Sequence, residues 1–173
     1  GIDPWILEVK TEVFGNFDLS SDESVSALAE RVDIMIQQIH KDYEKRKLNS
    51  PPFVFVKNNS GTYGMGVTAV SSGEEVLHWN SKARKQMKVG KNRKEINEVI
   101  IQEGVRSCIT TDIGTAEPTV YLVGCELAGG FLRTHKDKGP NENLNSPGAV
   151  FKRLCVSDLR VDVEGNRMEN VYG

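Results

Sequence analysis

The stretch FVFVKNNSGTYGMGVTAV, residues 53–70, decides how the central part of this chain folds. Its first four residues are β-branched or aromatic, which predicts a short buried strand over Phe53–Val56 with Lys57 at its end. Val67–Val70 predicts a second strand, and a glycine-rich loop, residues 58–66, separates the two. A strand, a tight loop and a second strand predict a β-hairpin rather than the opening of a βαβ unit.

The glycine-rich loop has the chemistry of an anion site, because glycines bring backbone N–H groups close to a phosphate and Lys57 adds a positive charge. A Walker loop is excluded, since it needs a lysine after its last glycine, where this chain has Val67. A dinucleotide fingerprint opens a helix, whereas this loop is predicted to return into a second strand. A kinase-type loop carries its lysine on the following strand, whereas Lys57 precedes the glycines. From these residues alone, a phosphate-covering lid and a plain glycine-rich turn both remain open.

Amphipathic patterning predicts a long helix before the hairpin and a short one after it. Ser20 and Glu23 form a capping box, and apolar residues then recur at three- and four-residue steps to about Leu48. A second capping box, Ser72 with Glu75, predicts the start of the second helix.

The second half of the chain is predicted to consist of strands and one long loop. Val99–Gln102 has strand composition, and Thr119–Val123 and Leu127–Leu132 predict two strands joined by a hairpin turn at Gly124–Glu126. Thr134–Gly148 is rich in Gly, Pro and Asn and lacks periodicity, so it is a loop long enough to suggest a function.

Composition excludes several classes of protein. The 173 residues include 22 Lys and Arg against 24 Asp and Glu, a net charge of −2 that argues against a nucleic-acid binder. No apolar run approaches the roughly 18–20 residues of a membrane span, and no signal peptide is visible. The three cysteines are scattered, which favours reduced thiols and a cytoplasmic location.

Several motifs of the chain, taken in order, resemble the ATP-grasp ligases, and more narrowly the glutamate–cysteine ligases of some proteobacteria. Phe53–Lys57 followed by Gly61–Gly66 looks like the lysine strand and lid of that fold. Ile100–Val105 is similar to the hinge strand along which such ligases bind adenine.

The resemblance extends over nearly the whole chain. Ala116–Tyr121 with Gly129–Arg133 resembles the hairpin that ends in a phosphate-facing arginine, and Asn141–Gly148 resembles the asparagine-rich loop that follows it. Ile2–Trp5 is similar to the start of this region in the family. A departure is Asn58–Ser60, where members of the family carry Ala-Asp-Ala. The resemblance favours a nucleotide lid over a plain turn.

The fold that the resemblance implies is α+β and ATP-grasp-like, with two small lobes of antiparallel sheets and the nucleotide site between them. Residues 1–49 would form a leading segment with the amphipathic helix, residues 50–103 the lysine strand, lid and hinge strand, and residues 104–173 the second lobe. Family members are much longer and this sequence lacks an initiating Met, so we expect residues 1–173 to be part of a larger enzyme.

The activity that the resemblance implies is glutamate–cysteine ligation, the first step of glutathione synthesis, driven by ATP and Mg²⁺ through an acyl phosphate. The partners would be glutamate, cysteine and ATP, with no nucleic acid and no membrane. Two alternatives remain: another ATP-grasp peptide-bond-forming ligase, and a degenerate nucleotide-binding module without catalysis.

The resemblance also implies roles for individual residues. Lys57 and Arg133 would neutralise phosphate oxygens, with Asn143 and Asn145 completing the catalytic set. The nucleotide would contact Lys57, Gly61, Thr62, Tyr63, Gly64, Gly66, Gln102, Glu103, Val105 and Glu117. A metal ion would be held by Glu142 and Asn145.

Each of these residues also has a plainer interpretation. Arg133 is equally typical of a surface ion pair, Glu117 of a structural carboxylate, and asparagines are common in turns because they bond their own backbone. A second candidate metal site is Glu164–Asn166 with Asp158 or Asp162.

Overall fold

The computed structural model describes residues 1, 3–59, 66–79, 84, 87 and 97–154. The chain divides into two compact units, one made of Gly1–Arg106 with Asn141–Asn143 and the other of Ser107–Pro140 with the described residues from Leu144 onward. Each unit contains one four-stranded sheet in which all neighbouring strands are antiparallel. The predicted α+β class with two antiparallel sheets is confirmed.

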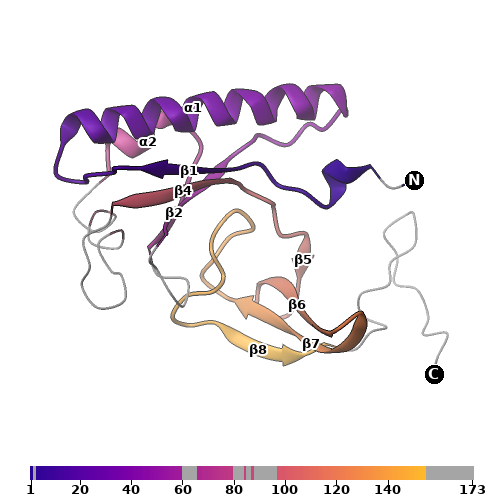
Figure 1. Cartoon of the computed structure of the whole chain (residues 1–173). Helices are drawn as coiled ribbons and strands as arrows, with labels where there is room; N and C mark the ends of the chain where they lie inside the picture. Colours follow the sequence, from indigo (N-terminus) through magenta and orange to yellow (C-terminus); the bar gives the residue numbers. More distant parts are fainter. Residues whose placement is uncertain (2, 60–65, 80–83, 85–86, 88–96, 155–173) are drawn as a thin grey trace. The chain divides into compact units, whose positions relative to one another are not determined.

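The first unit is a sheet covered on one side by helices (Figure 1). Its strands follow the spatial order β1–β4–β2–β3, where β1 is Thr11–Gly15, β2 is Val54–Asn58, β3 is Val67–Val70 and β4 is Glu98–Glu103. Its helices are η1, Pro4–Ile6, α1, Asp22–Lys45, and α2, Gly73–Leu77. The β2–β3 hairpin is the one predicted from residues 53–70.

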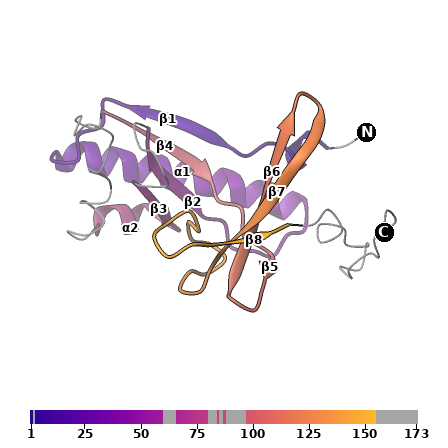
Figure 2. The same cartoon turned by 90° about the horizontal axis from the view of Figure 1, so that it is seen from below.

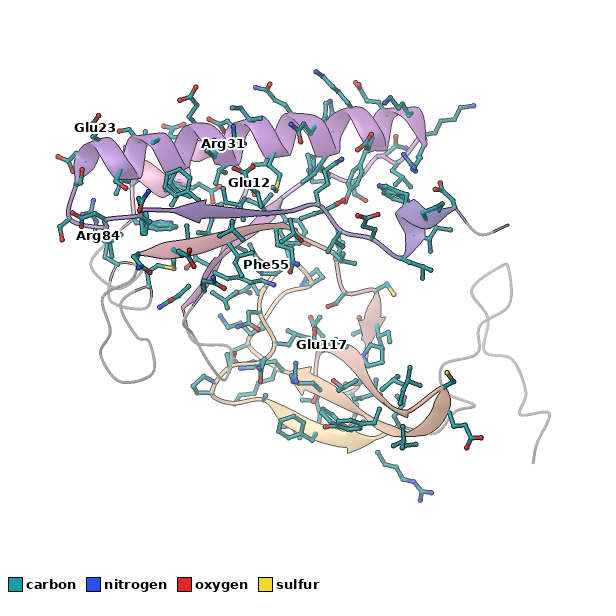
Figure 3. The ribbon with its side chains drawn as sticks, in the orientation of Figure 1. Glu12, Glu23, Arg31, Phe55, Arg84 and Glu117 are labelled. Carbon is teal, nitrogen blue, oxygen red and sulfur yellow. The ribbon has the colours of Figure 1, made fainter. Side chains whose placement is uncertain are left out.

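The core of this unit lies between α1 and the sheet. Along β2 and β4, alternate side chains are buried, and they meet the apolar stripe of α1. The stripe consists of Val25, Leu28, Ala29, Val32, Met35 and Ile39. Full burial of each large aliphatic side chain contributes roughly 1.5–3 kcal/mol. The alternation turns Phe55, Lys57 and Gln102 to the opposite face of the sheet, where Figure 3 shows Phe55 pointing away from α1.

The start of α1 lies one residue later than predicted. The N-cap is Ser21, whose Oγ accepts from the backbone N–H of Ser24 at 3.2 Å. The predicted cap, Ser20, lies in the preceding turn, where its N–H donates to Asp18 Oδ1 at 2.8 Å. The helix also ends at Lys45 rather than near Leu48.

Two further boundaries differ from prediction. Strand β2 begins at Val54 rather than Phe53 and continues past Lys57, so the lysine lies within the strand. The predicted cap of α2 is confirmed, because Ser72 Oγ accepts from the N–H of Glu75 at 3.4 Å. Strand β1 was not predicted.

The second unit is built on a long hairpin (Figure 2). Its strands follow the order β5–β6–β7–β8, with β5 at Ile109–Thr110, β6 at Thr115–Val123, β7 at Glu126–His135 and β8 at Val150–Arg153. The predicted hairpin is confirmed, but β7 extends through Thr134 and His135, which were assigned to the following loop. Strands β5 and β8 were not predicted. Within the described ranges, no helix has the length and apolar character to cross a membrane.

The junction of α1 and α2 leaves no room for a side chain at Gly73. The Gly73 N–H donates to Asp33 Oδ1 at 2.7 Å, and a Cβ on Gly73 would lie 2.4 Å from the carbonyl oxygen of Ala29. We expect Gly73→Ala to lower the free energy of unfolding by about 1–3 kcal/mol through overpacking. Gly15→Ala is the control, because a Cβ there meets nothing within 4 Å. Thermal unfolding measures the difference, and equal melting temperatures for the two variants would contradict the close packing of α2 on α1.

Candidate functional site

The side chains of Lys57 and Gln102 meet on the face of the first unit's sheet that is turned away from α1. Gln102 lies opposite Phe55 in the pairing of β4 with β2, and Lys57 lies two residues further along β2 on the same face. Lys57 Nζ donates a hydrogen bond to Gln102 Oε1, and it lies 5.7 Å from the centroid of the Phe55 ring. The structure therefore brings together two of the predicted nucleotide-binding residues.

The Lys57 ammonium is half-buried and held by a neutral acceptor. Burial lowers the pKa of Lys57 below that of an ordinary lysine, because the charged form loses solvation. Its contact with Gln102 places an amide oxygen rather than a carboxylate beside the charge. A positive charge that is partly desolvated and not neutralised by this partner is suited to an anionic ligand such as a phosphate.

The hinge residues separate onto the two faces of the sheet. The Glu103 carboxylate is buried on the α1 side, where its Oε2 accepts from the N–H of Lys10 at 3.1 Å. The Glu103 N–H is also used within the unit, since it donates to the Lys10 carbonyl at 2.8 Å. Val105 is 66% exposed. Thus Gln102 faces the Lys57 side of the sheet, whereas Glu103 secures the start of β1 from the other side.

The residues at the base of the predicted lid close the hairpin. Gly66 has a φ of 70°, which favours glycine, and its carbonyl oxygen accepts from the N–H of Asn58 at 2.8 Å. The Asn58 side chain is 5% exposed, and its Nδ2 donates to the carbonyl oxygen of Met87 at 3.1 Å. Asn58, the first of the three residues that depart from the family pattern, is therefore a buried structural residue. The lid residues Gly61, Thr62, Tyr63 and Gly64 lie outside the described part of the chain.

A β-bulge aligns Arg133 with Glu117 in the second unit. Near the turn, Leu122 pairs with Leu127, and continuing that register would place Glu117 opposite Leu132. The register shifts between Tyr121 and Leu122, and beyond the shift Glu117 lies opposite Arg133. Arg133 Nη1 donates to Glu117 Oε1 at 2.6 Å.

The Arg133 guanidinium keeps an unused donor. Its side chain is 19% exposed, and Nε is buried without a hydrogen-bond partner among the described residues. A buried N–H without a partner is costly, so an acceptor brought by a ligand would be favoured at this position. The Arg133 guanidinium and the Lys57 ammonium are therefore each suited to bind an anion that is rich in oxygen atoms.

Two buried side chains, Leu144 within the asparagine-rich loop and His135 beside its C-terminal end, hold this loop. Leu144 is 1% exposed and His135 is 3% exposed. His135 Nδ1 accepts from the N–H of Asp137 at 3.2 Å, so Nε2 carries the proton and donates to the Pro147 carbonyl at 3.0 Å. At Gly148, with a φ of 99°, a Cβ would lie 3.1 Å from His135 Nε2. His135 therefore holds the end of the loop against β7.

The predicted metal ligands belong to different parts of the chain. Glu142 is exposed and belongs to the first unit with Asn143, whereas Asn145 belongs to the second. In the described ranges, no group of three or more His, Cys, Asp or Glu side chains could hold a metal ion. The alternative ligands Asp158, Asp162 and Glu164–Asn166 lie outside those ranges. Nucleotide-bound Mg²⁺ commonly needs one or two protein carboxylates because phosphates and water supply the rest.

Comparison with known proteins connects this geometry to one family. The sequence pattern of the family GshA: Glutamate-cysteine ligase matches residues 1–171. No curated protein matches the chain. A crystal structure at 1.90 Å resolution, of a "Putative gamma-glutamylcysteine synthetase" from Methylobacillus flagellatus KT, is similar with a TM-score of 0.74 and 36% sequence identity.

That similarity covers 88% of this chain and 37% of the Methylobacillus protein, so this chain spans well under half the length of its structural relative. The match extends over both units, because residues 1–171 include all the described residues of each. The chain belongs to the glutamate–cysteine ligase family.

Proposed function

We propose that this chain is the ATP-handling portion of a glutamate–cysteine ligase that forms γ-glutamylcysteine. The observation that carries the proposal is the contact of a half-buried Lys57 ammonium with Gln102, on one sheet face of a chain that matches the family over residues 1–171. The exposed free thiols of Cys108 and Cys125 are compatible with a reducing cytoplasm, the location we propose.

The proposed reaction has two steps. A γ-carboxylate oxygen of glutamate attacks the terminal phosphorus of ATP, ADP leaves, and an acyl phosphate forms. The amine of cysteine then attacks the acyl carbon, phosphate leaves with the electrons of the broken C–O bond, and the amine loses a proton. Both steps move highly charged groups, so positioning and electrostatic stabilisation supply most of the catalysis.

The residues of the chain have matching proposed roles. Lys57 and Arg133 would bind phosphate oxygens and stabilise the charge that develops on them, while Glu117 orients Arg133. Gln102 and the main chain around Glu103 and Val105 would contact adenine. Residues 61–66 would cover the phosphates, Asn143 and Asn145 would contact the reacting groups, and Mg²⁺, held by phosphate oxygens with Glu142 and Asn145, would neutralise charge.

A thermal shift measurement on the chain tests the nucleotide site. With Mg-ATP at 100 times Kd, the folded state should gain about 2.7 kcal/mol. For a protein of this size, that gain corresponds to a rise in Tm of about 5–10 °C. The same concentration of Mg²⁺ with inorganic phosphate serves as the control. No shift of the wild-type chain with Mg-ATP would remove the proposed nucleotide site.

The substrates are tested in the longer ligase. Phosphate release should require glutamate and cysteine together. Release with a different acid and amine would instead identify another peptide-bond-forming ligase. Nucleotide binding without phosphate release from any pair would identify a nucleotide-binding module without catalysis.

A further inference from the structure

The face of the first unit's sheet that is turned away from α1 carries a chain of hydrogen bonds that crosses three strands. Lys57 on β2 donates to Gln102 Oε1 on β4. Gln102 Nε2 in turn donates to Thr11 Oγ1 on β1 at 3.0 Å, and the Thr11 hydroxyl donates to the Val9 carbonyl at 3.2 Å. Thr11 lies directly opposite Gln102 in the pairing of β1 with β4.

The direction of this chain is fixed at its far end. A backbone carbonyl can only accept, so Val9 requires the Thr11 hydroxyl to donate its single proton there. The Thr11 oxygen is then left as an acceptor, and it selects the NH₂ end of the Gln102 amide. The carbonyl end of the same amide must point the other way, toward Lys57.

We propose that Thr11 is a positioning residue of the nucleotide site, which fixes the orientation of the Gln102 amide so that its carbonyl oxygen holds the Lys57 ammonium in place before nucleotide binds. The role of Thr11 in nucleotide binding rests on the proposed function, whereas the hydrogen bonds themselves are present in the chain without nucleotide. It gives a role to β1, which carries none of the residues predicted for the site.

The groups around Lys57 make its ammonium dependent on the orientation of the Gln102 amide. Burial, rather than a neighbouring charge, lowers the pKa of Lys57, so the ammonium depends on the acceptors within reach. The carboxylate on the same face of β4, Glu98, accepts from Asn59 Nδ2 at 2.9 Å. The opposing residues on β1 and β3 that share this face, Val13 and Val67, are apolar. An amide turned around would present NH₂ to the ammonium and repel it.

The test compares variants of Thr11 by NMR of the Lys57 side chain, in nucleotide-free protein whose lysines are labelled with ¹³C and ¹⁵N. Thr11→Val removes the hydroxyl but keeps the β-branched shape, and we expect it to lower the pKa of Lys57 by about one pH unit. Thr11→Ser should restore the wild-type pKa. Thr110→Val makes the same change at an exposed position of β5 in the other unit and should leave the pKa of Lys57 unchanged.

A second measurement follows Mg-ATP binding by the same variants. Thr11→Val should weaken Kd by about threefold to tenfold, and Thr11→Ser should restore it. If Lys57 titrates identically in wild type and Thr11→Val, the positioning role is wrong, whether or not Mg-ATP binds. If its pKa moves as expected while wild type fails to bind Mg-ATP, the hydrogen-bond chain is upheld and the proposed nucleotide function fails.

Discussion

Lys57→Met is expected to reduce the kcat/KM of the proposed ligase for ATP by about 10²–10³-fold, the effect of removing one preorganised charge that stabilises a transition state. Methionine keeps the length and apolar stem of the side chain but cannot donate to Gln102 or to a phosphate. Because the ammonium is half-buried beside the neutral amide of Gln102, the substitution leaves no positive charge at this contact. Steady-state phosphate release measures the change.

Lys45→Met is the matched control for this variant. Lys45 is 74% exposed at the end of α1, where it lies 3.7 Å from Asp42, so the same substitution there should leave kcat/KM unchanged. The Tm of Lys57→Met without nucleotide should remain at or slightly above that of wild type, because a partly desolvated charge is removed. An active Lys57→Met enzyme would show that the ammonium takes no part in phosphate binding.

The lowered pKa of Lys57 adds a pH dependence with a definite sign. The ammonium is the form that attracts phosphate, and its folded-state pKa lies below that of an ordinary lysine because of burial. Affinity for Mg-ATP is therefore retained at neutral pH and lost as pH rises through this lowered value. This loss should be absent from Lys57→Met, whose residual binding has no such group to titrate.

Local patterns in the sequence were sufficient to predict α1, α2 and the two hairpins, but not the edge strands β1, β5 and β8. The α1 stripe and the alternation of β2 and β4 follow directly from apolar spacing. Strand β1 was missed because one of its two helix-facing residues is Glu12, which holds Arg31 by two hydrogen bonds of 2.8 Å. Figure 3 shows these two side chains pointing toward one another between β1 and α1.

Contacts between distant residues could not be predicted because they depend on strand register. The residues Lys57 and Gln102 were both singled out, but their contact requires the alignment of β2 with β4. Thr11 gave no signal, since its partner lies 91 residues away along the chain. The Arg133–Glu117 pair depends on a bulge, and a slip of one residue would send a side chain to the other face.

Arg133→Leu is the second variant for which we expect a large effect, a decrease of about 10²–10³-fold in kcat for phosphate release. The guanidinium already uses Nη1 for Glu117 and keeps a buried, unpartnered Nε among the described residues. Leucine fills similar apolar space beside Phe131 but provides no donor. Arg153→Leu is the control, because Arg153 is an exposed arginine on β8.

Glu117→Gln distinguishes a phosphate ligand from a structural ion pair. Because the Glu117 side chain is 36% exposed, losing the pair should cost only about 0–1 kcal/mol of stability in either variant. If Arg133 serves only the pair, Arg133→Leu and Glu117→Gln should decrease activity equally, and the double variant no further. If Arg133 binds phosphate, Glu117→Gln should lower kcat by less than about tenfold, because its amide oxygen still accepts from Nη1, and Arg133→Leu alone should account for the loss.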